Sequence, residues 1–201
     1  MMNNSEILYI KKPEWLSWDA VQQCQAKAHE RNKKNGLNMH CSELTGAELA
    51  ESLKDGICYV ALKEDQVVGT CSLIIQDGTW FFKNKRVGYL AMAGVLPEYQ
   101  GTEVYFELQK LRMKDIKEQK VEILYFDTAE NNTLVRKMNA KQGFKPVYYI
   151  CFKSTDYYSV TMAKWLIGKP KSELWLKVYF WLSEKIVKLR YKPGKIKRFG
   201  I

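Results

Sequence analysis

The chain has 201 residues, a mass of 23.5 kDa and a hydrophobic content of 46%, which suits one domain with a real core and excludes global disorder. Five cysteines without a C-x-x-C pair and only two histidines give no zinc-ligand spacing, so we expect no metal site. Such thiols suit a reducing compartment. The N-terminus lacks a signal-peptide pattern and no run reaches the roughly 18 apolar residues of a membrane span, so we expect a cytoplasmic protein.

The net charge of +10 is concentrated near the C-terminus. Residues 167–201 hold ten Lys and Arg against two Glu, a local charge of +8, which leaves only +2 for the rest of the chain. The basicity therefore belongs to a C-terminal segment and not to the protein as a whole.

In chain order, the first elements are a strand, two helices and a hairpin. The helical pattern of residues 15–33 is followed by a second at residues 45–54, where Thr45 and Glu48 have capping-box spacing. The polar turn at residues 63–65 separates two apolar runs, which predicts a hairpin. The strands of this part are expected at residues 7–10, 57–62 and 66–75. Residues 80–86 predict an exposed loop or a short strand.

The second half alternates strands and helices. Residues 87–95 predict a central strand that ends at Pro97, because proline cannot donate to a strand ladder. A helix is expected at about residues 102–118 and a second at residues 129–144, where Asn131 or Asn132 can cap the start and Gly143 can take the left-handed conformation at the end. Further strands are expected at residues 121–126, 147–152 and 158–164, the last two on either side of the turn at residues 154–156.

With these elements in this order, roughly residues 7–166 resemble the GNAT superfamily of acyl-CoA-dependent N-acyltransferases. Residues 95–101, Val-Leu-Pro-Glu-Tyr-Gln-Gly, are similar to the family's strand end and phosphate-loop entry. Residues 127–132 followed by Gly143-Phe144 are similar to its second motif, the hairpin matches its second and third strands, and residues 162–164 match the end of its last strand. The resemblance implies an α+β fold, a three-layer α/β/α arrangement with a mixed central sheet. Residues 1–166 would be the acyltransferase domain and residues 167–201 a basic amphipathic extension.

The resemblance also implies a site for acetyl-CoA or another acyl-CoA, and no metal. A helix N-terminus presents unpaired N–H groups and positive partial charge, so the turn at residues 100–105 would hold the pyrophosphate. Backbone groups before it would pair with the pantetheine arm, and one near Val95 would polarise the thioester carbonyl. An asparagine at the second motif would contact the arm from the other side. The implied cofactor-binding residues are Ala93, Gly94, Val95, Gln100, Gly101, Thr102, Glu103, Val104, Tyr105, Asn131 and Asn132.

Two departures from the family pattern affect the chemistry. Glu103 and Tyr105 replace the two loop glycines, and Glu103 brings negative charge toward a pyrophosphate. Asn139 stands where many relatives have a tyrosine that can protonate the leaving thiolate. A base is also needed, because an alkylamine with a pKa of about 10 is mostly protonated at neutral pH. The predicted catalytic residues are Asp127, Tyr89 and Asn139, with His40 as a second candidate base and Tyr125 and Tyr148 as further proton donors.

Two functions are compatible with these residues. The first is transfer of an acetyl or other acyl group from acyl-CoA to an amine, carried by a small molecule or sugar, by direct attack in a ternary complex. The second is a GNAT-fold binding module that has lost catalysis, motivated by Glu103, Tyr105 and Asn139 and peripheral at a membrane surface. The acceptor pocket would be built from residues 30–45 and 76–86.

The C-terminal segment 172–191 reads as a helix with a narrow charged side and a wide apolar arc. We favour packing of the apolar arc on the domain or across a homodimer. The alternative is an interfacial helix on an anionic membrane at the inner face, in which residues 172–198 supply aromatic and basic groups. Nucleic acid ranks last, because the basic run at residues 192–198 is not part of any recognition motif.

Overall fold

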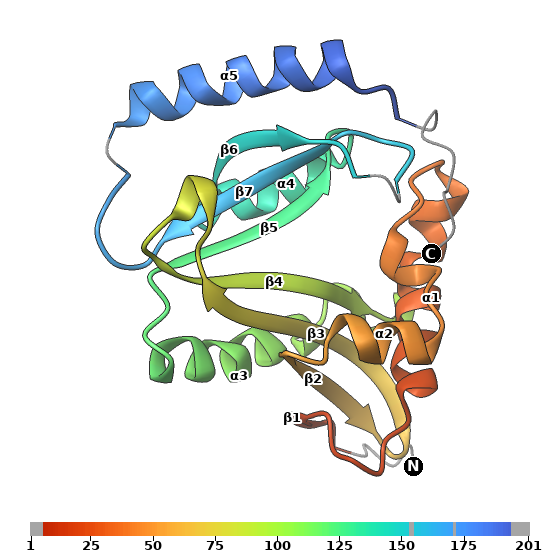
Figure 1. Ribbon diagram of the computed structural model, residues 1–201. Helices are drawn as coiled ribbons and strands as arrows, with labels where there is room; N and C mark the ends of the chain where they lie inside the picture. The colour runs from red at the N-terminus through yellow and green to blue at the C-terminus, as the bar shows by residue number, and fades with distance from the viewer. Residues whose placement is uncertain (1–5, 153–154, 171, 194–201) are drawn as a thin grey trace. The chain divides into compact units, whose positions relative to one another are not determined.

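A computed structural model describes residues 6–152, 155–170 and 172–193 (Figure 1). The fold is α+β with a mixed sheet and a C-terminal helix, as predicted. Within the described residues the sheet has seven strands and there are five α-helices. The described chain divides into two compact units. The first takes the residues up to Gln76 together with Gly88–Lys120, and the second takes Asp77–Val87 and the residues from Val121 onward. The domain boundary at residue 166 stays a prediction.

The first unit is built on consecutive antiparallel strands. β1 (Leu8–Lys11) pairs with β2 (Gly56–Lys63), and β2 pairs with β3 (Gln66–Asp77), which precedes β4 (Arg86–Val95) in the strand order. Lys63 pairs with Gln66, so the predicted hairpin is confirmed and turns through only two residues. The helices of this unit are α1 (Trp18–Lys34), α2 (Gly46–Ser52) and α3 (Val104–Glu118), with single 3₁₀ turns at η1 (His40–Ser42) and η3 (Pro97–Tyr99).

Short side chains fix where the first two helices begin. The Ser17 hydroxyl accepts a hydrogen bond from the Ala20 N–H at 3.1 Å, which starts α1. The capping box predicted for α2 is present: the Glu48 N–H donates to Thr45 Oγ1 at 3.2 Å, and the Thr45 N–H donates to Glu48 Oε2 at 2.8 Å. Both boundaries are therefore set by local sequence.

α3 is joined to the strands of the first unit by a buried polar contact and by a close approach. Asp115 accepts hydrogen bonds from the Lys11 ammonium at 2.6 Å and from the hydroxyl of the fully buried Tyr59 at 2.7 Å. A Cβ at Gly69 would lie 2.7 Å from the Val104 side chain, so only glycine lets the first turn of α3 approach β3 this closely. The approach at Gly69 positions the N-terminus of α3, and the hydrogen bonds of Asp115 hold its C-terminal end.

The second unit is a three-stranded antiparallel group with two helices. Its strands β5 (Ile123–Ala129), β6 (Lys145–Ile150) and β7 (Ser159–Trp165) have the order β5-β7-β6. α4 (Thr133–Lys141) and α5 (Glu173–Arg190) complete it. Residues 80–82 form a 3₁₀ turn, η2 (Trp80–Phe82), and not the loop or strand that the sequence suggested. The hydrophobic core of the second unit consists of Phe82, Val87, Ile123, Val147, Ala163 and Leu176.

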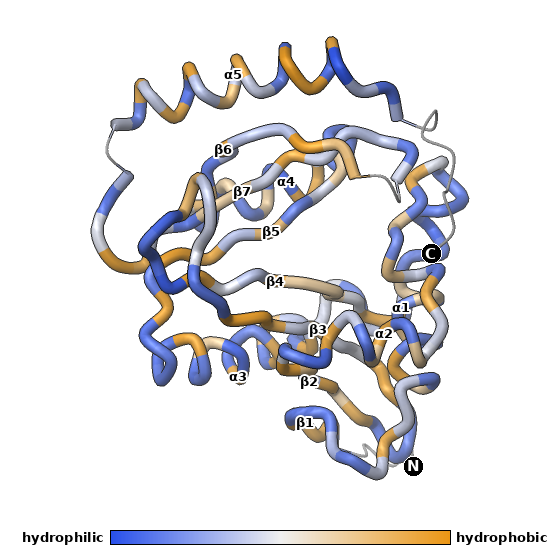
Figure 2. Tube along the Cα trace, in the orientation of Figure 1, coloured by the Kyte–Doolittle hydropathy of each residue, from blue (hydrophilic) through white to orange (hydrophobic). Residues whose placement is uncertain are grey.

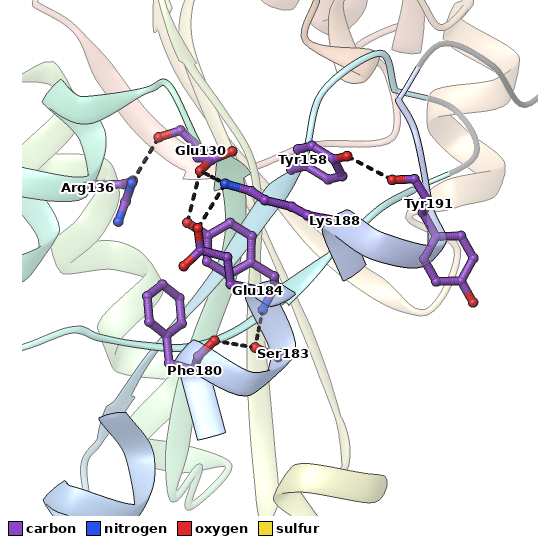
Figure 3. A network of polar contacts seen from close by, with 9 residues as sticks. Glu130, Arg136, Tyr158, Phe180, Ser183, Glu184, Lys188 and Tyr191 are labelled. Carbon is purple, nitrogen blue, oxygen red and sulfur yellow. Dashed lines mark hydrogen bonds and ion pairs between the residues drawn. The ribbon is translucent and has the colours of Figure 1, made fainter. Parts of the chain in front are cut away.

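The C-terminal helix α5 packs against β6, so the packing interpretation is correct for one of its faces. Leu176 is buried, and the Tyr149 N–H donates to the Ser183 hydroxyl at 3.0 Å (Figure 3). No helix within the described residues is long and apolar enough to cross a bilayer. Part of the predicted basic run, residues 194–198, lies outside the described residues, as do residues 153–154 and 171.

Candidate functional site

The end of β4, which holds the predicted pantetheine-binding residues Ala93, Gly94 and Val95, has an irregular backbone. Met92 has a φ of +50°, a conformation that is uncommon for a residue with a side chain and is typical of functional sites. The buried amide of Gln25 on α1 donates to the Met92 carbonyl. A Cβ at Gly94 would lie 3.0 Å from Ala28 Cβ and 3.1 Å from Gln25 Oε1, so α1 lies directly against this strand end.

The segment after β4 turns sharply into the N-terminus of α3, as the family resemblance implies. The Gln100 amide donates back to the Val95 carbonyl at 3.0 Å, and Gly101 has a φ of +81° with open space, free of other atoms to 4 Å, where a side chain would begin. The Thr102 hydroxyl donates to the Tyr99 carbonyl at 2.6 Å. α3 starts at Val104, and the first N–H groups of a helix have no partner within it. The N–H groups of Gln100, Thr102 and Val104 already donate within this segment, so the backbone donors beside the open space are those of the first turn of α3 after Val104.

Backbone N–H groups at this turn favour an anion, but the acidic side chains around it oppose one. Glu103 is exposed at the N-cap position of α3, and Glu107 lies one turn further along. Burial, followed by these two carboxylates, raises the pKa of Tyr9. Glu107 is paired with Lys110 at 2.5 Å, whereas Glu103 belongs to the turn itself and brings a negative charge to it. Tyr105 is half-buried, and burial raises its pKa, so its ring is partly inside the unit.

One residue beside the β4 end was missed by the sequence reasoning. His29 lies one helical turn after Gln25 on α1, and its Nδ1 is 3.1 Å from the Asn32 amide nitrogen. Its Nε2 is buried, and the imidazole lies against the Ala93 backbone at the end of β4. Burial lowers the pKa of His29, an effect that the nearby Ala93 carbonyl opposes, so the imidazole is held neutral. His40, the predicted candidate base, is exposed in η1.

The i, i+4 spacing of Gln25 and His29 on α1 was the available sequence signal, because it places both side chains on one helix face. Tyr89, a predicted catalytic residue, is half-buried on β4 in the same unit. Tyr89, the residues at the β4 end, the turn at residues 100–105 and His29 all belong to the first unit. Contacts join His29 to Ala93 and Gln100 to Val95.

The remaining predicted residues belong to the second unit. Asp127 on β5 accepts a hydrogen bond from the Thr161 hydroxyl on β7. Asn132 caps α4, where its side chain accepts from the Val135 N–H at 3.4 Å, while Asn131 is exposed just before it. Asn132 is therefore the cap of the two candidates.

Asn139 makes a local contact within α4. The side-chain amide of Asn139 donates to the Val135 carbonyl at 2.9 Å, and the backbone carbonyl of Asn139 accepts from the Phe144 N–H at 3.0 Å. Gly143 has a φ of +90°, which confirms the predicted left-handed helix end. Leu134 and Met138, which the sequence places on one face of this helix, are both exposed.

A cleft of about 690 Å³ lies in the first unit between α1 and the β2–β3 turn. It includes Leu96 and Tyr99 from the end of β4 and η3, but no residue of the turn at 100–105. Lys27 and Lys63 line it, and the Lys63 ammonium lies 5.7 Å from the centre of the Tyr99 ring. No group of three or more His, Cys, Asp and Glu side chains that could hold a metal is found among the described residues.

Comparisons with known proteins agree with this geometry. Residues 18–144 match the family model of the GNAT acetyltransferases, so the chain belongs to this family. A comparison with curated protein sequences finds no significant match.

Solved structures show the same fold at low sequence identity. A probable acetyltransferase from Staphylococcus epidermidis ATCC 12228 is 15% identical, with a TM-score of 0.61 over 80% of this chain and 99% of that one. A protein from Pyrococcus horikoshii OT3 is 17% identical, with a TM-score of 0.62 over 81% and 100%. The PaiA N-acetyltransferase from Thermoplasma acidophilum, solved with coenzyme A, is 16% identical, with a TM-score of 0.60 over 80% and 99%.

Proposed function

We propose that the protein transfers an acetyl or other acyl group from acyl-CoA to an amine, by direct attack in a ternary complex. One observation carries the proposal: the irregular β4 end is followed by a turn, with Gly101 at positive φ, that opens onto the N-terminus of α3. A pyrophosphate needs backbone donors and room to approach them. The open space at Gly101 supports the proposal, and the N–H groups of the first turn of α3 after Val104 would be the donors. Membership of the GNAT family supports the same reaction class.

In the proposed reaction, the amine nitrogen bonds to the thioester carbonyl carbon and the carbon–sulfur bond breaks. CoA leaves as the thiolate, which is reasonable for a thiol with a pKa near about 8.5. A backbone N–H near Val95 would stabilise the oxyanion of the tetrahedral intermediate. Asn131 and Asn132 remain candidates for contacting the pantetheine arm, although Asn132 already caps α4.

We propose His29 as the acceptor of the proton that the amine loses. A base must be unprotonated before the reaction, and burial lowers the pKa of this imidazole. The Asn32 amide donates to Nδ1, so Nε2 carries the hydrogen of the neutral ring, and the imidazole would accept the amine's proton at Nδ1 once that contact opens. His29 lies in the same unit as the β4 end. Asp127 is the alternative base and Tyr89 the candidate proton donor, while the Asn139 amide is occupied within α4.

The second candidate is a GNAT-fold module that binds acyl-CoA or a partner without catalysis. Glu103 favours it, because an exposed carboxylate at the helix N-cap opposes a pyrophosphate. We expect the acceptor in the first case to be a small-molecule or sugar amine in the cytoplasm.

Calorimetric titration of the full chain with acetyl-CoA, with desulfo-CoA as a second ligand, tests the cofactor site. Gly101→Ala should weaken binding, because alanine at this φ is strained by about 1–2 kcal/mol and its Cβ would fill the open space through which the phosphate would approach the backbone. Gly36→Ala is the matched control, since Gly36 also has positive φ and no atom within 4 Å of a Cβ. Equal binding by both variants would remove the proposed pyrophosphate position.

Thiol release with a panel of amines then separates the two functions. If the wild type releases thiol and His29→Gln does not, while its affinity for acetyl-CoA is unchanged, the result supports the acyltransferase and His29 as the proton acceptor. Binding without release for any amine favours the module. No binding of acetyl-CoA, longer acyl-CoA or CoA contradicts the acyltransferase and leaves only a module that binds a partner.

A further inference from the structure

α5 has an inner face that is fixed to the second unit. Phe180 packs on Tyr149 with ring centres 4.9 Å apart, and Leu176 is buried in the core. The Lys188 ammonium donates to Glu130 at 2.5 Å and to Glu184 at 2.9 Å (Figure 3). These contacts hold the helix in one rotational position, so the face that it turns outward is defined.

The outward face of α5 is apolar over most of its length. Figure 2 shows hydrophobic positions recurring along the helix. Their exposed fractions run from 42% for Leu182 to 85% for Leu189. This outer face consists of Leu174, Trp175, Val178, Trp181, Leu182, Ile186 and Leu189. At 1.5 Å per residue the outer face is about 25 Å long. It is therefore a contiguous apolar patch and not a set of scattered single residues.

Aromatic side chains of the second unit extend the outer face at its N-terminal end. Trp175 stacks on Tyr179 with ring centres 5.0 Å apart, and the exposed Trp80 of η2 lies 5.8 Å from the same tyrosine. Tryptophan and tyrosine combine an apolar ring with a polar hydrogen-bonding group, which suits them to the headgroup level of a bilayer.

The charged side chains of α5 that make no ion pair with a described residue are all basic. Lys177, Lys185, Arg190 and Lys192 are exposed on α5 or directly after it. The helix has two carboxylates, and both are paired: Glu173 with Lys145, and Glu184 with Lys188, which Glu130 also contacts. An apolar face with basic groups beside it and no unpaired acid is complementary to an anionic lipid surface.

We propose that α5 is a membrane-docking helix that lies in the plane of an anionic lipid surface, with its outer face inserted among the headgroups and upper acyl chains. Neighbouring basic residues would contact lipid phosphates. A second copy of the chain fits less well, because it would bring the same positive charges against each other with no carboxylate between them.

Co-sedimentation of the full chain with vesicles tests the proposal, using phosphatidylcholine alone and phosphatidylcholine mixed with phosphatidylglycerol. We expect binding to the anionic vesicles only, weakening as salt is added. Trp181→Ser should reduce the partition coefficient by about tenfold, because a large apolar group leaves the interface. Trp15→Ser is the matched control, since Trp15 is 66% exposed in the first unit against 54% for Trp181.

Lys185→Glu should also reduce binding, whereas Lys141→Glu on α4 should leave it unchanged; both lysines are exposed. Circular dichroism of each variant establishes that it is folded. Equal losses for Trp181→Ser and Trp15→Ser, or no binding to anionic vesicles, would overturn the proposal. So would a dimer in sedimentation-velocity runs without lipid that Trp181→Ser converts to a monomer, because the outer face would then be covered by a second copy. The assay contains no acyl-CoA, so its outcome is independent of the proposed enzyme activity.

Discussion

Replacing Lys188 by methionine is expected to loosen the attachment of α5 to the second unit. The Lys188 ammonium lies 2.5 Å from Glu130 and 2.9 Å from Glu184, and Tyr149 donates a second hydrogen bond to Glu130 at 3.1 Å. Hydrogen bonds to both carboxylates raise the pKa of Lys188, with Glu130 contributing most. The ammonium is therefore charged at neutral pH, and its contribution to stability is lost only in strongly alkaline solution, as pH rises through the raised value.

The magnitude follows from the exposure of the pair. The Lys188 and Glu130 side chains are 35% and 32% exposed, between surface pairs worth about 0–1 kcal/mol and buried ones whose disruption costs about 3–5 kcal/mol. We expect Lys188→Met to cost about 1–2 kcal/mol, and a double-mutant cycle with Glu130→Gln to give a coupling of about 1 kcal/mol. For a chain of this length, each 1 kcal/mol lowers Tm by about 2–4 °C.

Chemical denaturation followed by circular dichroism measures the four corners of this cycle. Lys185→Met is the control, since Lys185 is exposed on the same helix and makes no ion pair with any described residue. A coupling below about 0.3 kcal/mol, the level expected for independent sites, would refute the reasoning. Equal destabilisation by Lys185→Met would show that the effect comes from the helix and not from the pair.

Three further predictions address the first unit. Because burial lowers the pKa of His29, the unfolded state binds the extra proton, so stability should fall as the pH drops below about 6.5, and His29→Gln should flatten that part of the stability–pH curve; an unchanged slope contradicts this. Tyr59→Phe should cost about 1.5–3 kcal/mol by removing the bond to Asp115, whereas Tyr9→Phe, which removes a buried hydroxyl without a partner among the described residues, should cost nothing in the same unfolding assay. Glu103→Gln should tighten acetyl-CoA binding a few-fold by calorimetry, and an unchanged affinity would mean that this carboxylate faces away from the phosphates.

Features decided within a few residues could be predicted from the sequence. The Thr45–Glu48 capping box, the hairpin turn after Lys63 and the left-handed Gly143 all follow from local backbone geometry, and the structure confirms each. The order of elements, together with the motifs at residues 95–101 and 127–144, identified the family and the fold class, because strand and helix periods survive even where sequence identity is low.

Contacts between distant segments could not be predicted in the same way. Gln25 reaches the Met92 carbonyl across 67 positions of sequence, so nothing near His29 shows that it lies beside the β4 end. The loop or strand expected at residues 80–86 was wrong for residues 80–82, where η2 instead places Phe82 in the core. Tertiary packing, and not local propensity, determines both features.

The outer face of α5 shows why periodicity alone does not identify a docking surface. Helical periodicity predicts a wide apolar arc, but only the contacts of Leu176, Phe180 and Ser183 show which part is consumed in packing. The rest is exposed, so its apolar side chains add little to the stability of the described fold. Trp181→Ser should therefore leave the free energy of unfolding within about 0.5 kcal/mol of the wild type while it weakens binding to anionic vesicles. A large destabilisation would instead place Trp181 in the packing of the protein, and the apolar outer face would need no lipid to explain it.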